Sequence, residues 1–202
     1  YPGGRIRLIV PLAPGGSLDS IGRILAQKLT DSMGQTVVVD NRAGGTAIIG
    51  TAILAGSPPN GYTIMIANIA HGANPSLHKT MPYDAEKSFS PVTLLVQLPG
   101  LLVVHPSVRV RTTSELIALA RAKPGELTYA SSGVGSSNHL FMELFKVSTG
   151  TQITHVPFKG GGPALVDLVG GQVKTMFVAI PPALPFVKDA RLIARASRTA
   201  KR

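Results

Sequence analysis

The sequence contains no cysteine and no tryptophan, and aromatic residues make up only 5% of it. Without cysteine, the chain has no disulfide framework, no thiolate nucleophile and no cysteine-ligated metal site. No apolar stretch approaches the roughly 20 residues that a helix needs to cross a bilayer. The small number of aromatic side chains also disfavours a protein that stacks on the bases of nucleic acids.

Positive charge is in excess, because 20 Lys and Arg against 10 Asp and Glu give a net charge of +10. This balance makes nucleic acid, anionic lipid and acidic small molecules conceivable partners. Most of the charges are scattered, as on an ordinary solvated surface. One group is denser, and its near-helical spacing leaves open a basic amphipathic helix at the C-terminus: Arg191, Arg195, Arg198 and Arg202.

With 44% hydrophobic and 15% charged residues, the chain is expected to fold. Short β-branched runs alternate with helical patterns, which predicts an α/β fold of mainly parallel sheets flanked by helices. The runs that predict strands cover residues 5–12, 36–39, 62–67, 100–104, 127–130, 154–158 and 173–180. The patterns that predict helices cover residues 18–33, 112–123, 138–147 and 163–169. A capping box opens the second of these helices at Thr112 and Glu115.

Two βαβ series predict two lobes that join near Leu98-Pro99-Gly100. The first lobe is expected to cover residues 1–99, with residues 195–202 returning to it. The second lobe is expected to cover residues 100–194.

Three loops that join a strand to a helix are rich in glycine or serine. Unpaired N–H groups and the positive end of the dipole at a helix start attract an anion. Glycine allows close backbone approach, and Ser17 or Asp19 can cap the first of these helices. Three such loops predict a carboxylate site in a cleft between the lobes. The loops contain Gly15 and Gly16; Ser131, Ser132, Gly133, Gly135, Ser136 and Ser137; and Lys159, Gly160 and Gly161.

Enzyme signatures are weak. Gly133-Val134-Gly135 begins the glycine pattern of a dinucleotide site, but Asn138 stands where that pattern requires glycine. No Walker A motif and no Gly-x-Ser-x-Gly nucleophile motif is present. Asp19 and Asp167 fit a cap and a helix surface better than an acid/base pair. With these motifs missing, we expect no cofactor. The histidines show no metal-ligand spacing, so we also expect no metal site: His71, His78, His105, His139 and His155.

Longer motifs occur in a fixed order: RIRLIVPLAPGGSLD, GQTVVVDNRAGG, PPNGYTIMIAN, NPSLHKTMPYDAEKSFSPVTLL, PGELTYASSGVGSSNHLFMELF and HVPFKGGGPALVDLVGGQVKTMF. In order and spacing they resemble the solute receptors of the tripartite tricarboxylate transporters, the TctC-like or Bug family. The resemblance covers nearly the whole chain. It implies a periplasmic, two-lobed fold of the type II periplasmic-binding-protein kind. Such a receptor closes on a small organic carboxylate and delivers it to the membrane components of the transporter, without catalysis.

The resemblance also implies where the ligand is held, often through water. The corresponding positions are Ala13, Pro14, Gly15 and Gly16, followed by Ser17; Ser132, Ser136, Ser137 and His139; and Lys159, Gly160 and Gly161. His139 lies in the first helical turn, where ligand binding, capping and packing are all open to it.

The chain departs from the family pattern at two places. Asn68 and His71 lie where small hydroxyl residues usually follow the third strand, and Val178 stands where a polar or acidic residue is common. We therefore expect these three residues to line a less polar site. Of the family's conceivable ligands (di- and tricarboxylates, amino acids and aromatic acids), such a site favours a more hydrophobic carboxylate.

Length is a further departure, because family members are substantially longer, and the chain therefore resembles a C-terminally shortened member. Its start at Tyr1-Pro2 fits an exported protein whose signal peptide is removed or not included. The rival class is a basic protein that binds nucleic acid or an anionic surface, although the resemblance predicts no nucleic-acid partner. An α/β enzyme acting on a phosphorylated metabolite is the third alternative.

Overall fold

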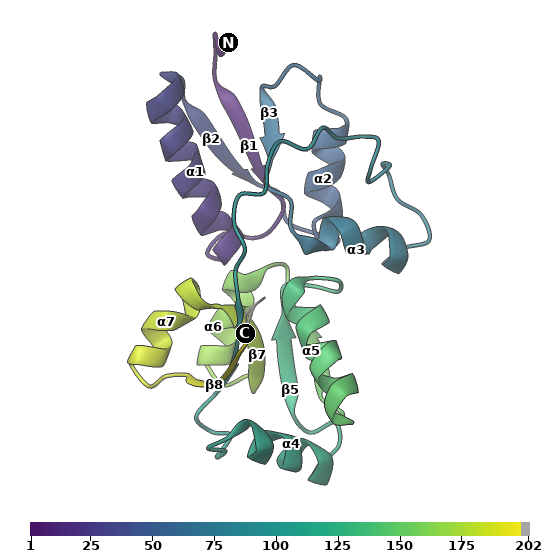
Figure 1. Cartoon of the computed structure of the whole chain (residues 1–202), viewed down its shortest axis with the longest axis vertical. Helices are drawn as coiled ribbons and strands as arrows, with labels where there is room; N and C mark the ends of the chain where they lie inside the picture. Colours follow the sequence, from purple (N-terminus) through teal and green to yellow (C-terminus); the bar gives the residue numbers. More distant parts are fainter. Residues whose placement is uncertain (199–202) are drawn as a thin grey trace. The chain divides into compact units, whose positions relative to one another are not determined.

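The computed structural model describes residues 1–198, with side chains described as far as residue 195. The chain divides into two compact units, Tyr1–Thr93 and Leu94–Arg202. Each unit contains a sheet with helices packed against it (Figure 1). The predicted α/β class is therefore confirmed.

Unit 1 contains a parallel sheet in the order β2-β1-β3. Its strands are β1 (Ile6–Val10), β2 (Val37–Asn41) and β3 (Thr63–Met65), and its helices are α1 (Ser17–Met33), α2 (Ile48–Ala55) and α3 (Ile69–Leu77). The core surrounds Ile6 and Leu8 of β1. The predicted apolar stripe of α1 packs against this core through Leu18, Ile21, Leu25 and Leu29.

Unit 2 contains a sheet in the order β6-β5-β7-β4-β8. Its strands are β4 (Gly100–Val104), β5 (Thr128–Ser131), β6 (Thr154–Pro157), β7 (Thr175–Ala179) and β8 (Ile193–Arg198). Its helices are α4 (Thr113–Ala122), α5 (Ser137–Thr149), α6 (Gly161–Val169) and α7 (Ile180–Lys188). β5, β6 and β7 run parallel, whereas β4 is antiparallel to both of its neighbours, β7 and β8.

Side chains of β4 alternate between two hydrophobic clusters on opposite faces of this sheet. Leu102 packs with Leu116 and Tyr129, whereas Val103 packs with Leu168 and Met176. Successive side chains of a strand point to opposite faces. An apolar run without alternation is therefore the pattern of a strand that helices cover on both sides, as the sequence predicts.

Each predicted strand is present, with shifts of a few residues at the ends. Thr112 caps α4 as predicted, accepting a hydrogen bond from the N–H of Glu115 at 3.1 Å. The Glu115 carboxylate accepts from the N–H of Arg111 at 2.6 Å, one residue earlier than a capping box requires. α2, α3 and α7 were not predicted, and two of them contain an interior proline, Pro75 and Pro185.

The C-terminal arginines require a correction. Residues 193–198 form β8, so Arg195 and Arg198 lie in a strand and not in the amphipathic helix that their spacing allowed. Arg191 precedes β8, and Arg202 lies outside the described residues. β8 pairs with β4, so residues 195–198 belong to the sheet of unit 2 and do not return to the first lobe. The rest of that expectation falls on residues 199–202, which the structure does not describe.

A membrane span needs a helix that is both long and apolar. None of the helices within residues 1–198 meets both requirements.

Candidate functional site

Three parallel strands of unit 2 lead into helices at the same edge of the sheet. β5, β6 and β7 run in one direction, and each is followed by a helix, α5, α6 and α7 respectively. The loop after β6 is tied to the end of β5, because the N–H of Phe158 donates to the carbonyl of Ser131 at 3.0 Å. In sheets of this kind, ligands bind beyond the carboxyl ends of the strands.

The loop between β5 and α5, residues 132–136, is here called the serine loop. Ser136 is the N-cap of α5: its Oγ accepts from the N–H of His139 at 3.5 Å and donates to the carbonyl of Gly133 at 2.6 Å. The Ser132 hydroxyl donates to Oδ1 of Asn138 at 2.6 Å. Two of the predicted hydroxyls are therefore engaged by the protein itself.

Hydrogen-bond donors remain available to a ligand in the first turn of α5. N–H groups in the first turn of a helix have no carbonyl partner inside the helix, and Ser136 caps only that of His139. This leaves the N–H groups of Ser137 and Asn138, together with the Ser137 hydroxyl, at the positive end of the helix dipole. Backbone donors in this position suit a carboxylate or another anion.

Asn138 is a residue whose role the sequence did not predict. Besides accepting from Ser132, its side-chain amide donates to the carbonyl of Phe177 in β7 at 2.6 Å. In the sequence, Asn138 was noted only because it stands where a dinucleotide-binding pattern requires glycine. Its position fixes the start of α5 against the neighbouring strand.

Two histidine rings lie beside the serine loop. His139 Nδ1 accepts from the N–H of Gly135 at 3.2 Å, and His155 Nε2 lies 2.6 Å from the Oγ of Ser131. The two ring centroids are 4.6 Å apart, and the His155 ring also stacks on Tyr129 at 4.7 Å. Ser131 was predicted only as one of the polar residues of its loop, and His155, which begins the motif of the loop after β6, was not predicted as a site residue.

Burial sets the charge of these rings. Burial, together with the neighbouring His139, lowers the pKa of His155 to about 4. The pKa of His139 is also lowered, mainly by burial, although the Glu143 carboxylate opposes this. Burial would raise the pKa of Glu143, but hydrogen bonds from Lys146 and Tyr129 outweigh it and the pKa is lowered. At neutral pH both rings are therefore uncharged beside an ionised Glu143.

The loop after β6 offers a cation and an uncapped helix start. Gly160 is the N-cap of α6 and no side chain caps this helix. Lys159 is exposed and forms no ion pair within the described part of the chain. Val178 has a different environment, because it is only 5% exposed and packs in the cluster of Ala130 and Ala164.

In unit 1 the loop between β1 and α1 is tied to an acidic side chain. Gly15 donates its N–H to Oδ2 of Asp19 at 3.1 Å, and Asn41 and Arg23 donate to the same carboxylate at 3.0 Å. Burial tends to raise the pKa of Asp19, but these hydrogen bonds outweigh it and the pKa is lowered. No side chain caps α1 at Gly16, which corrects the expectation that Ser17 or Asp19 does so. The loop is therefore a less suitable anion site than its glycines suggest.

The second predicted region of unit 1 surrounds the start of α3. Asn68 is the N-cap residue, and its buried Oδ1 has no hydrogen-bond partner among the described residues. His71 Nε2 lies 2.9 Å from the carbonyl of Ala85, and its ring packs against Tyr83 and Phe89. His71 is thus held by residues 83–89.

Comparisons with known proteins identify the family of this chain. Residues 21–202 match the family model of TctC, described as the tripartite tricarboxylate transporter family receptor. The chain belongs to this family. It is 40% identical to Protein BugT of Bordetella pertussis over 200 residues, which cover 97% of this chain and 61% of BugT. It therefore spans less than two thirds of the length of this relative.

Solved structures of longer proteins share the fold of this TctC-family chain. Each match includes the whole of this chain and 68–69% of the length of the other protein. One described as a periplasmic transporter is 39% identical, with a TM-score of 0.96. R. palustris Rpa4515 with adipate is 38% identical, with a TM-score of 0.96. MatC (Rpa3494) from Rhodopseudomonas palustris with bound malate is 28% identical, with a TM-score of 0.93. The two-lobed, periplasmic-binding-protein-like fold is thereby confirmed.

Within this family member, unit 2 carries the predicted residues of two loops at one sheet edge. The serine loop and the loop of Lys159, Gly160 and Gly161 follow adjacent parallel strands. In unit 1, Ala13, Pro14, Gly15, Gly16 and Ser17 follow β1, and Asn68 and His71 follow the adjacent β3. No cluster of three or more His, Asp or Glu side chains that could hold a metal occurs within residues 1–198.

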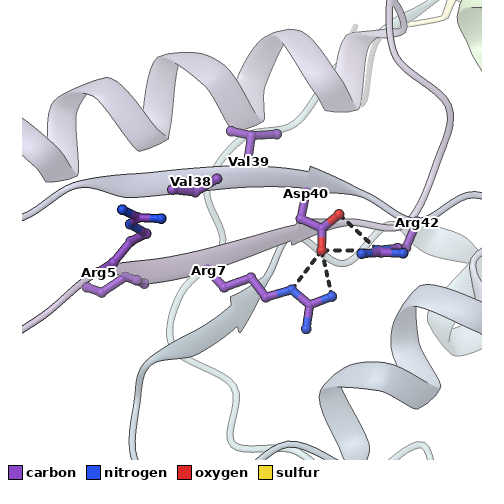
Figure 2. Close-up of a pocket in the computed structure, with 7 residues that line it drawn as sticks. Arg5, Arg7, Val38, Val39, Asp40 and Arg42 are labelled. Atoms are coloured by element: carbon purple, nitrogen blue, oxygen red, sulfur yellow. Dashed lines mark hydrogen bonds and ion pairs between the residues drawn. The ribbon is translucent and has the colours of Figure 1, made fainter.

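A shallow pocket elsewhere in unit 1 contains none of the predicted residues. Figure 2 shows Asp40 of β2 between the guanidinium groups of Arg7 and Arg42, with Oδ2 at 2.7 Å from Nε of Arg7. The pocket is lined by Arg5, Ile6, Arg7, Val38, Val39, Asp40 and Arg42. Its only carboxylate is already paired with two arginines, so it has no unpaired acid/base group for chemistry.

Proposed function

We propose that this TctC-family chain is the solute-binding part of a periplasmic receptor that captures a small organic dicarboxylate. In this proposal it hands the ligand to the membrane components of a tripartite tricarboxylate transporter and catalyses no reaction. Support comes from the family membership and from the relatives whose structures hold adipate and malate.

The observation that carries the proposal is the start of α5. Ser136 caps the N–H of His139, so the N–H groups of Ser137 and Asn138 remain for one ligand carboxylate. Lys159, on the adjacent loop, adds a positive charge without an acidic partner in the described residues. The loop of Gly15 is assigned a lesser part, because Asp19 already occupies its N–H.

The nearest resemblance to a catalytic pair is the contact between Ser131 and His155, and its geometry argues against catalysis. Ser131 is fully buried, so its hydroxyl has no access to a substrate. Its Oγ also accepts from the N–H of Gly133 at 3.1 Å, which directs it into the loop. A nucleophile must reach the atom it attacks. These residues therefore serve the structure of the loop.

The proposed ligand has two carboxylates joined by an apolar segment. Val178 stands where a polar or acidic residue is common in the family, and its side chain packs among apolar residues, so it adds no polar group there. The adipate-bound relative is more similar to this chain than the malate-bound one. Adipate is therefore the first ligand to test.

Thermal-shift and calorimetric titrations test the proposal. Adipate, malate and benzoate are compared with uncharged adipamide and with a DNA duplex, at low and high salt. A ligand present at 100 times its Kd adds about 2.7 kcal/mol to the free energy of unfolding. We expect a shift with adipate and none with adipamide. Salt-sensitive DNA binding without any carboxylate response would instead support the rival function.

A pair of substitutions at Ser137 tests the role of the helix start. Ser137→Pro removes one N–H donor, and proline is favoured at the first helical position. The preceding Ser136 has ψ 161°, close to the conformation that proline requires of its neighbour. Ser137→Ala is the matched control, because it keeps the N–H. We expect Ser137→Pro to weaken adipate binding about tenfold more than Ser137→Ala does.

A further inference from the structure

We propose that His155 and Ser131 are positioning residues, which hold the serine loop in the conformation that presents the first N–H groups of α5 to the ligand. The proposal rests on the proposed function of that helix start. It concerns two residues that make no ligand contact themselves. Ser131 is 0% exposed, and His155 contacts both its Oγ and the ring of His139, which accepts from the N–H of Gly135 in the loop.

Ser131 is the first link between strand and loop. Its Oγ lies 2.6 Å from His155 Nε2, 3.1 Å from the N–H of Gly133 and 3.2 Å from the carbonyl of Gly133. A hydroxyl has one proton and two lone pairs. All three contacts are satisfied together only when His155 Nε2–H donates to Ser131 and Ser131 donates to the Gly133 carbonyl. The N–H of His155 thus sets the direction of the Ser131 hydroxyl.

Gly133 passes this constraint on to the helix. Its φ is 120°, a conformation that glycine accepts and other residues rarely adopt. Its carbonyl also accepts from the Oγ and the N–H of Ser136, at 2.6 and 3.2 Å. Ser136 is the N-cap, and its backbone sets the direction in which Ser137 begins the helix. A hydrogen-bonded path therefore joins β6 to the start of α5.

The His155 ring is itself fixed by its surroundings. The ring faces Tyr129 of β5. It also faces three side chains of α5, His139, Glu143 and Lys146. Tyr129 is in turn held by Glu143, whose Oε1 accepts from the phenol oxygen at 2.5 Å. Lys146 donates to the same carboxylate at 2.7 Å. A neutral ring fits between these groups. A cation there is poorly solvated and is repelled by His139 and Lys146, which together outweigh the attraction of Glu143.

Three variants separate positioning from simple loss of structure. His155→Phe keeps a ring between Tyr129 and His139 but loses the hydrogen bond, and Ser131→Ala loses the hydroxyl alone. His155→Gln is the rescue variant, because its side-chain amide can donate to Ser131 and does not titrate. At pH 7.5 we expect His155→Phe and Ser131→Ala each to weaken adipate binding about tenfold, and His155→Gln by less than about threefold. The double variant Ser131→Ala/His155→Phe is expected to match the single variants, because both break one path.

The pH dependence of the Kd for adipate separates a positioning role of His155 from simple destabilisation of the fold. Protonation of His155 places a cation in its packed site, so binding by the unaltered chain is expected to weaken as the pH falls towards 4. His155→Gln removes this contribution. The ratio of the two Kd values cancels the titration of adipate itself. Because the pKa of His155 is about 4, half of the chains carry the proton at pH 4, and we expect this ratio to change about twofold between pH 7.5 and 4.

Amide hydrogen exchange tests the positioning role without a ligand. We expect the N–H groups of Gly133 and Ser136 to exchange about tenfold faster in His155→Phe and Ser131→Ala, with those of α4 unchanged. Should His155→Phe not fold, Ser131→Ala carries the same test. Unchanged loop exchange in Ser131→Ala overturns the proposal. Faster loop exchange together with no carboxylate binding by the unaltered chain retains the positioning role and overturns the proposed function instead.

Discussion

The side chain of Asn138 joins the ends of two neighbouring strands, accepting from Ser132 Oγ and donating to the Phe177 carbonyl, both at 2.6 Å. Ser132 follows β5, and Phe177 lies in the adjacent β7. Ser132 is only 6% exposed, so its hydroxyl has little access to water if Asn138 is removed. The start of α5 is therefore fixed from β7 as well as from its own loop.

Asn138→Ala is expected to lower the free energy of unfolding by roughly 1–3 kcal/mol, because it leaves a buried donor and a buried carbonyl without partners. Urea denaturation followed by circular dichroism measures this loss. Asn138→Asp is the informative companion, because it keeps the acceptor for Ser132 but adds a negative charge at the proposed carboxylate site. Adipate should bind Asn138→Asp more weakly than Asn138→Ala, and equal affinities would argue against a carboxylate at this helix start.

Gly50 of α2 lies where another backbone approaches closely. A Cβ at this position would lie 2.7 Å from Cβ of Pro11 and 2.9 Å from the carbonyl oxygen of Arg42. Gly72 of α3 is the matched control, since a Cβ there meets nothing within 4 Å. We expect Gly50→Ala to destabilise the chain by about 1–3 kcal/mol and Gly72→Ala to stabilise it by up to about 1 kcal/mol. Thermal unfolding compares the two, and equal effects would contradict the close packing of α2 on Pro11.

Local sequence patterns predicted the strands and four of the helices, because each of these carries its own periodicity. β4 could be recognised from its apolar run, since Leu102 and Val103 face opposite hydrophobic clusters. α7 could not, because Pro185 and the prolines at its start suggest a break. Prolines are compatible with the first helical turn. The segment packs on the sheet of unit 2 through the buried Ala183, a tertiary contact that the local sequence does not reveal.

The candidate site could be located but not analysed from the sequence. Serine and glycine between a strand and a helix marked the serine loop, which is a local signal. The partners of that loop are distant in sequence: Ser131 meets His155, and Asn138 meets Phe177. Such pairs depend on the order of β5, β6 and β7 in the sheet, which no single segment encodes. The same reason explains why residues 195–198 of β8 were expected to return to the first lobe.

Asp19 is expected to contribute to stability although it lies beside a proposed ligand loop. It is 5% exposed and accepts hydrogen bonds from Gly15, Asn41 and Arg23. Asp19→Ala should lower the free energy of unfolding by roughly 1–3 kcal/mol at pH 7. Asp31→Ala, at an exposed position of the same helix, is the control and should change it by less than about 0.5 kcal/mol. Because the pKa of Asp19 is below its ordinary value of 3.8, this contribution is present above pH 3.8 and is lost at lower pH.

The acid stability of the chain should depend on His155. Its pKa is about 4 in the folded protein and 6.5 when unperturbed. As the pH falls below 6.5, the unfolded chain binds a proton that the folded chain does not, so the free energy of unfolding decreases until about pH 4. After allowance for partial solvent access, this loss is on the order of 1–2 kcal/mol. Urea denaturation between pH 7.5 and 4 should show a smaller decrease for His155→Gln than for the unaltered chain. Parallel curves for the two proteins would mean that His155 is protonated equally easily in both states, and the neutral ring between Tyr129 and His139 would then lose its support.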